Sequence, residues 1–366
     1  MAIIKKAKET MTSRERVVKT FNYEKTDRVP INYMTNEVIH GKLAKALGLD
    51  PRDSDSINDA LGVDIRMIHP DYKGPLIFKE LPGRNVDPVY GFYSKWIENE
   101  AGGYHDFVDF PLAGASDEEI YAYTFPSADD FDYDGALEKM HSYEDYGLSC
   151  GHAGMPDIIN ATGRIMNMEN TLIGLVTRDE AVLDLVDRKL SLELGILERL
   201  LDKAGGRIDF VWLGEDLGTQ HAPMISPDLF ADVFRPRLQR FVDLAKAYKL
   251  PVMIHTCGSS SWAYEDFIEM GIGAVDTLQP EAANMSPEYL VEHFGGRLAF
   301  QGFISTAGPL AYGTAEETRE YCRKTLEFMK KNRGYFFCPT HQIQDNSPVE
   351  NVIAMYQAAH TYGIYD

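Results

Sequence analysis

Short runs of β-branched or aromatic residues alternate with longer helical patterns along the whole chain, and this alternation constrains the fold more than any other feature. Eight runs are predicted strands: Arg28–Met34, Val63–Ile68, Tyr146–Gly151, Ile208–Leu213, Val252–Thr256, Ala274–Leu278, Leu298–Gln301 and Tyr335–Cys338. Eight repeats of strand and helix favour a parallel (β/α)₈ TIM barrel. No linker rich in Pro, Ser or Gly divides the chain, so we expect a single α/β domain over residues 1–366.

Helix signals are clear in the second half of the chain. Apolar spacing and start signals predict helices over 180–203, from 226 to about 249, from 314 to about 331, and over 348–362. Ser226 before Pro227 is a favourable N-cap, and Thr314 with Glu317 matches the capping-box pattern. We expect Ser347 to cap the last helix.

The first half is less regular. Residues 75–125 contain aromatic and glycine-rich runs, VYGFYSKWIENEAGGYHDFVDF, which predict a β-hairpin inserted between the second and third strands. The alternative is a long loop without structure, which is uncommon in compact domains.

Charge and cysteine content narrow the classes of partner and compartment. The formal net charge of −20 would repel a phosphate backbone, so we expect neither nucleic acid nor an anionic membrane as a partner. No run approaches the ~18 apolar residues of a membrane span, and the N-terminus has no apolar signal-peptide core. Four cysteines are too few for a disulfide scaffold in 366 residues, so we expect reduced thiols and a cytoplasmic protein.

The strongest chemical signal is His255-Thr256-Cys257-Gly258, at the exit of a predicted strand. Residues two apart on extended backbone face the same side, so the imidazole of His255 and the thiol of Cys257 form a natural half-site for zinc. Cys338 ends the eighth predicted strand, and all strands of a barrel end on one rim, which makes it the expected third ligand. An open fourth position would make the zinc catalytic. Each residue alone is more often part of the core; the three together favour a metal.

Other polar residues are expected on the same rim. Glu215 and Asp216 follow the fourth predicted strand and suit a fourth metal ligand or a general acid or base, with a helix-start charge as the alternative. Candidates for substrate binding, each of which could instead close a turn, are Asn36, Gln279, Gln301 and His341. Cys150 and His152 form a weaker competing ligand pair, and Cys322 is expected to pack in the core. No GxGxxG, GxxxxGK[ST], HExxH or GxSxG motif supports another chemistry.

Four stretches resemble the uroporphyrinogen decarboxylase-like superfamily: MTSRERVVKTFNYEKTDRVPI, GEDLGTQHAPMISPDLFADVFRPRL, IHTCGSS and THQIQDNSPVENVIAMYQAAHTYG. The resemblance covers nearly the whole chain and implies a (β/α)₈ barrel. True uroporphyrinogen decarboxylases open with an arginine-rich MRQAGRY-type segment that grips the carboxylates of the substrate. This chain has VPINYMTNEVIHGKL in that place, without arginine, and a polycarboxylate in an acidic protein without that clamp is physically unfavourable.

The other branch of the superfamily comprises zinc-dependent methyltransferases that work with corrinoids. Its pattern, His-x-Cys followed far downstream by Cys, is matched by His255, Cys257 and Cys338. The resemblance implies these three as zinc ligands, with Glu215 as the choice for a further ligand. Gly302–Ser305 departs from the Gly-Gly-Ile-Asp sequence common among relatives that demethylate methoxylated aromatics, so it leaves the substrate open.

The resemblance therefore implies a methyltransferase that moves a methyl group between a small methylated compound, such as a methoxylated aromatic, and the cobalt of a corrinoid (cobalamin). The chain lacks the corrinoid-binding signature Asp-x-His-x-x-Gly, so the corrinoid is expected on a separate partner protein. Two alternatives stay open. One is a cofactor-free decarboxylase of the uroporphyrinogen decarboxylase type, and the other is a non-catalytic barrel in which the metal is structural.

Overall fold

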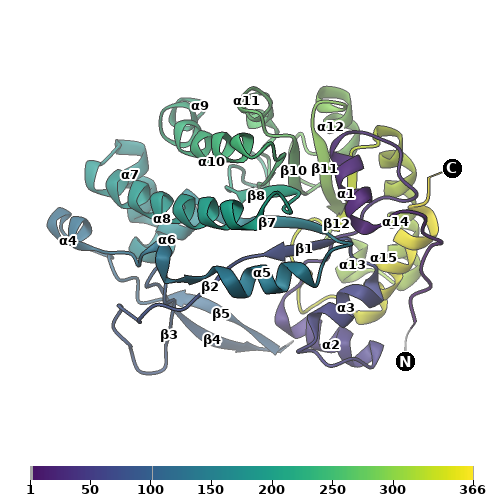
Figure 1. The fold of residues 1–366 in the computed structure, drawn as a ribbon, viewed down its shortest axis with the longest axis horizontal. Coiled ribbons are helices and arrows are strands. Elements are labelled where there is room, and N and C mark those ends of the chain that lie inside the picture. Colours follow the sequence, from purple (N-terminus) through teal and green to yellow (C-terminus); the bar gives the residue numbers. More distant parts are fainter. Residues whose placement is uncertain (1–2, 101, 366) are drawn as a thin grey trace.

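The computed structural model describes residues 3–100 and 102–365, and a sheet of seven parallel strands forms its centre (Figure 1). The strands lie side by side in chain order: β1 (Ile65–Ile68), β7 (Gly147–Pro156), β8 (Phe210–Gly214), β9 (Val252–His255), β10 (Ala274–Leu278), β11 (Ala299–Ile304) and β12 (Tyr335–Pro339). Seven of the eight predicted strands are confirmed, as is the α/β class.

The first predicted strand, Arg28–Met34, is not a regular strand. Its residue Ile31 forms a parallel bridge to Phe337 of β12, and the carbonyl of Ile31 accepts a hydrogen bond of 2.8 Å from the backbone of Asp64, next to β1. The segment therefore lies between the two edges of the curled sheet. Pro30 has no N–H to donate, and the N–H of Ile31 is taken by the Asp64 carboxylate at 2.7 Å, so a continuous ladder cannot form.

Helices surround the sheet and connect its strands. The longer ones are α1 (Ser13–Phe21), α2 (Glu37–Leu47), α3 (Ser54–Leu61), α5 (Tyr133–His141), α6 (Ile158–Met166), α7 (Met168–Thr177), α8 (Glu180–Ala204), α10 (Arg235–Ala247), α12 (Pro287–Phe294), α14 (Ala315–Met329) and α15 (Val349–Tyr362). The shorter ones are α4 (Asp117–Ala122), α9 (Pro227–Leu229), α11 (Tyr264–Met270) and α13 (Pro309–Tyr312), with one-turn segments η1 (Ala128–Asp130), η3 (Ser261–Ala263) and η4 (Lys330–Asn332). A π-helical segment, η2 (Phe230–Phe234), joins α9 to α10.

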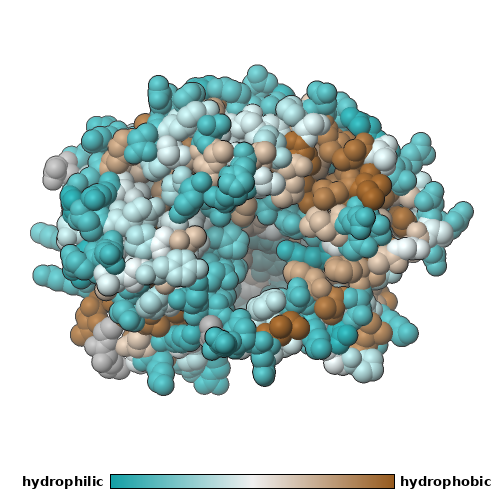
Figure 2. Space-filling model, turned by 180° about the vertical axis from the view of Figure 1, so that it is seen from behind, coloured by the Kyte–Doolittle hydropathy of each residue, from teal (hydrophilic) through white to brown (hydrophobic). Residues whose placement is uncertain are grey.

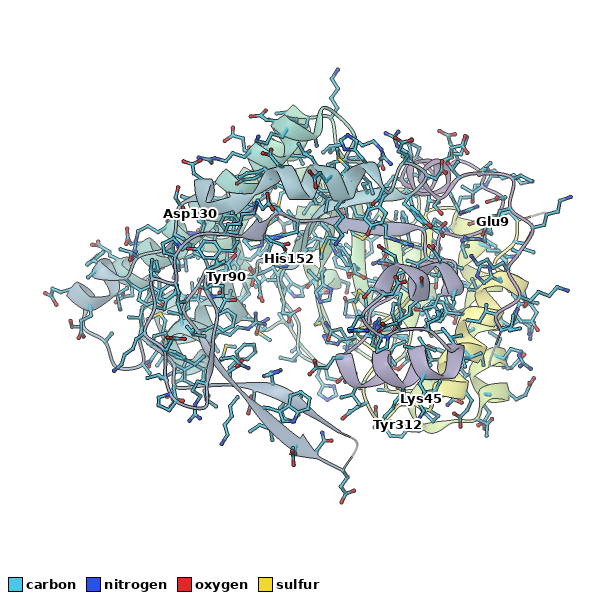
Figure 3. The ribbon with its side chains drawn as sticks, turned by 60° about the horizontal axis from the view of Figure 1, so that its bottom comes forward. Glu9, Lys45, Tyr90, Asp130, His152 and Tyr312 are labelled. Carbon is cyan, nitrogen blue, oxygen red and sulfur yellow. The ribbon has the colours of Figure 1, made fainter. Side chains whose placement is uncertain are left out.

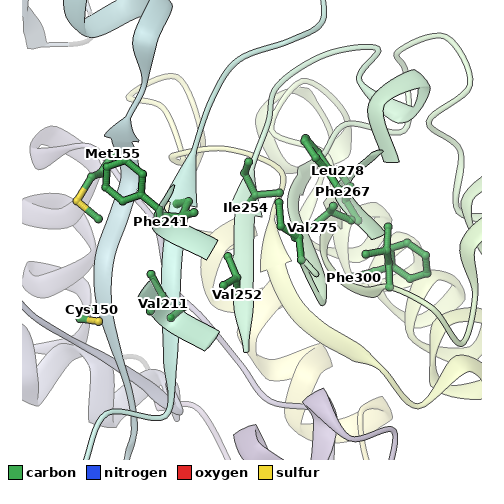
Figure 4. Close-up of a cluster of buried hydrophobic side chains, with 14 of the residues drawn as sticks. Cys150, Met155, Val211, Phe241, Val252, Ile254, Phe267, Val275, Leu278 and Phe300 are labelled. Carbon is green, nitrogen blue, oxygen red and sulfur yellow. The ribbon is translucent and has the colours of Figure 1, made fainter. Parts of the chain in front are cut away.

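Hydrophobic side chains fill both faces of the sheet. On the outer side, Val211, Ile254 and Val275 belong to a buried cluster with Phe241 of α10 and Phe267 of α11 (Figure 4).

A smaller cluster fills the inner side and includes Phe210, Met253, Phe336 and Val17 of α1. Phe21 of α1 also packs there, with its ring centroid 5.1 Å from those of Phe210 and Phe336. These residues lie near the beginnings of the strands, so α1 covers the amino-terminal end of the sheet and leaves the carboxyl-terminal end for a site.

Residues 75–125 contain a separate antiparallel sheet of β3 (Asn85–Val86), β4 (Tyr93–Asn99) and β5 (Gly102–Val108), followed by α4. Figure 1 shows this sheet apart from the central strands. β2 (Asp71–Tyr72) pairs with β6 (Phe131–Asp132) and joins the insertion to the body of the protein.

The predicted helix starts agree with the structure in all but one case. The side chain of Ser226 accepts a hydrogen bond from the N–H of Leu229, and Thr314 with Glu317 forms the capping box of α14. The prediction for Ser347 is wrong. Pro348 occupies the N-cap of α15, one residue later, and the buried Ser347 hydroxyl has no hydrogen-bond partner among the described residues.

Figure 2 shows a largely hydrophilic face that is hollowed near its middle. Within the described part of the chain, no helix has both the length and the apolar composition needed to cross a membrane.

A buried carboxylate, Asp64, ties the first predicted strand to the rest of the protein. It accepts hydrogen bonds from Arg16 of α1, from Arg28 at 2.6 Å and from the backbone of Ile31. Arg16 also pairs with Asp27 at 2.7 Å. Burial acts to raise the pKa of Asp27, but hydrogen bonds from Arg16 and from backbone N–H groups outweigh it and lower the pKa to about 2.

This pairing predicts a pH-dependent loss of stability. The folded-state pKa of Asp27 lies below the unfolded value of about 4, so its stabilisation is complete above pH ~4 and is lost as the pH falls toward 2. Asp27→Asn should lower the free energy of unfolding at pH 7 by roughly 1–3 kcal/mol and flatten its decline below pH 4. Urea unfolding at pH 7, 4 and 3 measures both effects. Asp232→Asn, at an exposed ion pair with Arg178, is the control and should cost less than about 1 kcal/mol. An unchanged acid slope in Asp27→Asn would contradict the assignment.

Candidate functional site

The candidate site lies where the carboxyl ends of the central strands meet a cavity of about 640 Å³. His255 is the last residue of β9 and pairs in register with Gly214, the last residue of β8. His255, Asp216 and His341 all line the cavity. Such a position at the strand ends is where parallel barrels place their active sites.

Three side chains converge at this position. The Sγ atom of Cys257 lies 3.5 Å from Nε2 of His255. His341, which follows β12, completes a group whose donor atoms all lie within 4.8 Å of one another. The His255 and Cys257 side chains share one side, as the two-residue spacing predicts. Two imidazoles and a thiol are suitable ligands for a metal such as zinc.

Asp276 of β10 sets the orientation of His255. Its Oδ2 atom lies 3.0 Å from Nδ1 of His255, and its Oδ1 atom accepts a hydrogen bond of 2.9 Å from the Gln301 side chain. The Thr277 hydroxyl also contacts Nδ1 of His255. Thr277 has a φ of 62°, a conformation that β-branched residues rarely adopt, at an irregularity in the pairing of β10 with β11. The Nε2 atom of His255 is thereby left facing Cys257.

The electrostatic environment favours a charged His255 and a neutral Cys257 in the absence of a metal. Burial lowers the pKa of His255, but hydrogen bonds with Asp276 and Cys257 and the Asp276 charge outweigh it and raise the pKa well above the usual value. Burial raises the pKa of the Cys257 thiol, and His255 offsets this only in part. A bound cation would replace the protons on both groups.

Of the two acids after β8, the structure places Asp216 rather than Glu215 beside this group. Oδ1 of Asp216 accepts a hydrogen bond of 2.9 Å from the backbone of Cys257 and lies 4.0 Å from Nε2 of His255. Both carboxylate oxygens of Glu215 instead accept backbone N–H groups of Ile158 and Ile159, at the start of α6. Glu215 therefore fits the alternative of a helix-start charge.

The remaining predicted residues are distributed as follows. Cys338 lies inside β12, fully buried, and outside the group of converging donors; burial, then the Asp276 charge, raise the pKa of its thiol. Gln279 accepts a hydrogen bond of 2.7 Å from the backbone of Gly258. Asn36 caps α2 through the N–H of Ile39.

Gln301 is buried in the interior of β11, which continues to Ile304, so it does not end its strand as predicted. Its partners are Asp276 and Asn32. The three side chains thus form hydrogen bonds within the protein: those of Gln301, Gln279 and Asn36. His341 instead faces the cavity. Cys150 is buried in the outer cluster, and Cys322 is buried on α14 as expected.

Asp276 and Thr277 were not singled out from the sequence. Strand alternation could have found Asp276, because it pairs in register with His255 on the neighbouring strand. The same alternation favours Asp216 over Glu215, since Gly214 pairs with His255 and Asp216 is two residues further on. The strained Thr277 gives no signal in the sequence.

Comparisons with known proteins agree with this architecture. The family model described as uroporphyrinogen decarboxylase (URO-D) matches residues 159–362, a range that contains Asp216, His255, Cys257, Asp276 and His341. Among solved structures, the chain is similar to a methyltransferase from Methanosarcina mazei, with 16% identity and a TM-score of 0.64 over 96% of this chain and 99% of that chain. This likeness shows a shared fold. No curated protein matches the sequence.

The contact between Asp276 and His255 predicts a change in titration. In Asp276→Asn the imidazolium loses its negative partner, so the pKa of His255 should fall. The pKa can be followed in metal-free protein by the ¹⁵N chemical shifts of the labelled imidazole. Asp232→Asn, an exposed carboxylate on η2, is the control and should leave the titration unchanged. An unaltered pKa of His255 in Asp276→Asn would show that Asp276 does not control this ring.

Proposed function

The chain belongs to the uroporphyrinogen decarboxylase family, and on this basis we propose that it is a zinc-dependent methyltransferase that acts with a separate corrinoid protein. The methyl group would move between a small methylated compound and the cobalt of the partner's corrinoid. The observation that carries this proposal is the group of His255, Cys257 and His341 beside the cavity.

The donor set fits zinc. Imidazole nitrogen and thiolate sulfur are its usual protein ligands, and a site with three protein ligands keeps a fourth position open. The hydrogen bond between Asp276 and Nδ1 of His255 is the outer-shell contact that ligating histidines usually make. His255 and Cys257 would hold the ion. His341 is supported as third ligand by proximity, and Cys338 by the sequence pattern.

The residues of the chain would prepare the reaction by binding and orientation. The Tyr33 and Trp212 side chains line the cavity and offer apolar surface to the body of a substrate. Asp276 would keep Nε2 of His255 directed at the ion. When bound, zinc would supply Lewis acidity that stabilises negative charge on the oxygen or sulfur that gains or loses the methyl group.

The decarboxylase alternative requires a proton donor in the cavity, and Asp157 and Asp216 are the acids that line it. Burial acts to raise the pKa of Asp216, but the neighbouring His255 and a hydrogen bond from Cys257 outweigh it and lower the pKa. Asp216 is therefore a poor proton donor, whereas burial raises the pKa of Asp157, which leaves Asp157 as the donor that the decarboxylase alternative would use.

We extend the proposal to the architecture and compartment. Residues 28–34 would complete an eight-stranded (β/α)₈ ring, since the backbone of residues 30–32 hydrogen-bonds to Phe337 of β12 and to Asp64 beside β1. The whole chain would be one domain, with residues 75–125 as its insertion. All four cysteines are free, which supports a reducing compartment such as the cytoplasm.

The first test is zinc content. His255→Ala and Cys257→Ala should lose most of the zinc and reduce methyl transfer to reduced free cobalamin by roughly 100-fold or more, since even outer-shell changes cost 10–100-fold. His341→Ala and Cys338→Ala, compared directly, identify the third ligand as the one whose loss empties the site. Cys322→Ala, at a buried thiol on α14, is the matched control, and Glu215→Gln should also keep its zinc.

Three outcomes would contradict this assignment. Protein without zinc would favour the decarboxylase, and zinc whose removal unfolds the chain would favour a structural metal. Full zinc in Cys257→Ala would place the metal elsewhere.

The second test is the pH dependence of zinc affinity. Cys257 must bind zinc as a thiolate, and His255 must bind it through an unprotonated ring nitrogen. Protons therefore compete with zinc at both side chains, and the affinity for zinc should fall as the pH falls from about 8 to 5. Titration calorimetry in buffers of different ionisation enthalpy should show proton release on binding. The pKa of Cys257 is raised by burial, so release should persist at pH 8. A constant affinity across this range would exclude thiolate ligation.

A further inference from the structure

One wall of the cavity carries an arginine that forms no ion pair with the described residues. Arg164, in the last turn of α6, lines the cavity. Among residues 3–100 and 102–365, its guanidinium has no ion pair and donates no hydrogen bond. It lies over aromatic rings of the insertion instead, 4.5 Å from the centroid of Phe107 and 5.9 Å from that of Phe92. Such stacking orients the planar group and leaves its N–H donors at the edge available.

The other arginine of the cavity is different. Arg66 pairs with Asp59 at 2.6 Å and donates to the carbonyls of Val63 and Ile65 at 3.1 Å. Arg66 is thus held by the protein itself, and Arg164 is not.

His152 of β7 adds a second donor to this cavity. Its Nδ1 atom accepts a hydrogen bond of 3.1 Å from the backbone of Gly154, so in the neutral ring Nε2 carries the hydrogen. Burial, followed by interactions with His69, Lys189 and Arg164, lowers the pKa of His152 to about 4, so the ring is neutral at pH 7. Figure 3 shows His152 near the middle of the molecule. Nε2 has no acceptor within the part of the chain that the structure describes.

The acids of the cavity form no hydrogen bond or ion pair with these donors in the described part of the chain, although the Arg164 charge acts to lower the pKa of Asp157. Asp157 caps α6 through the N–H of Asn160 at 3.2 Å, and burial raises its pKa. Asp216 accepts from the backbone of Cys257 and from the Asn160 side chain at 3.0 Å. Both carboxylates already have partners, whereas Arg164 and Nε2 of His152 have none.

We propose that Arg164 and His152 form an anion subsite that selects a substrate carrying a carboxylate. Arginine presents a rigid pair of donors that matches a carboxylate, and a neutral histidine adds a third without extra charge. The same cavity reaches His255 and His341, and its 640 Å³ is within the range for small-molecule sites. The inference rests on the proposed function and adds the class of substrate: a small methylated acid whose carboxylate binds at Arg164.

Binding of two matched probes tests this subsite. Titration calorimetry compares 4-methoxybenzoate with the neutral 4-methoxybenzamide on the full chain. Wild type should prefer the benzoate by at least roughly 10-fold. Arg164→Gln should weaken benzoate binding roughly 10- to 100-fold and change benzamide binding less than about 3-fold, and Arg164→Lys should recover part of the loss. His152→Ala should weaken benzoate binding by a smaller factor than Arg164→Gln does.

Arg297→Gln is the matched control, because Arg297 also lies over a ring, 5.7 Å from the centroid of Phe294, but does not line the cavity. An equal effect of Arg164→Gln on both probes, an effect of Arg297→Gln of the same size, or no preference for benzoate in wild type would overturn the subsite. Inorganic phosphate that binds as tightly as the benzoate, with the same dependence on Arg164, would overturn the carboxylate assignment.

The same titration on His255→Ala separates this inference from the proposed function. Benzoate binding that still depends on Arg164 in a variant without zinc or methyl transfer supports the subsite independently. If zinc content and methyl transfer are as expected but Arg164→Gln does not change benzoate binding, the carboxylate subsite is wrong and the proposed function is retained.

Discussion

The site depends on one buried carboxylate, Asp276. A buried charge is costly unless it is paired and hydrogen-bonded, and Asp276 meets this requirement through His255 of β9, the backbone of Thr277 and Gln301 of β11. These contacts tie the three neighbouring strands β9, β10 and β11 together. They also fix which nitrogen of His255 faces Cys257. The orientation of His255 within the donor group therefore depends on the hydrogen bonds of a single buried carboxylate.

Much of the fold could be predicted because it depends on local patterns. The strands after residue 60 are short hydrophobic runs between helical segments, and the spacing that marks α8 is visible in the sequence alone. The segment around Ile31 could not be predicted correctly, since its backbone N–H bonds to the side chain of Asp64, more than thirty residues away. The prediction for Ser347 was wrong for a more local reason. Pro348 is the N-cap of α15 rather than its first helical residue, so the helix begins one residue later than expected.

The site was predictable in part. The spacing of His255 and Cys257 is local and correctly placed both on one side. The choice between Glu215 and Asp216 depended on the register of β8 against β9, and the carboxylate of Glu215 is used by the start of α6. His341 was expected on the rim, but its approach to Cys257 depends on the path of the chain after β12. Arg164 gave no signal in the sequence, and His152 was noted only as a possible metal ligand beside Cys150, because an unpaired donor is recognised only when every potential acceptor has been located.

The central claim is that His255 and Cys257 bind zinc at the edge of the cavity. Zinc-edge X-ray absorption on the purified protein tests it most directly. The account predicts a shell of about four ligands, with imidazole nitrogen at about 2.0–2.1 Å and at least one thiolate sulfur at about 2.3 Å. One sulfur would indicate His341 as the third ligand, and two would indicate Cys338. A shell of oxygen and nitrogen without sulfur, or a spectrum unchanged in Cys257→Ala, would contradict the account.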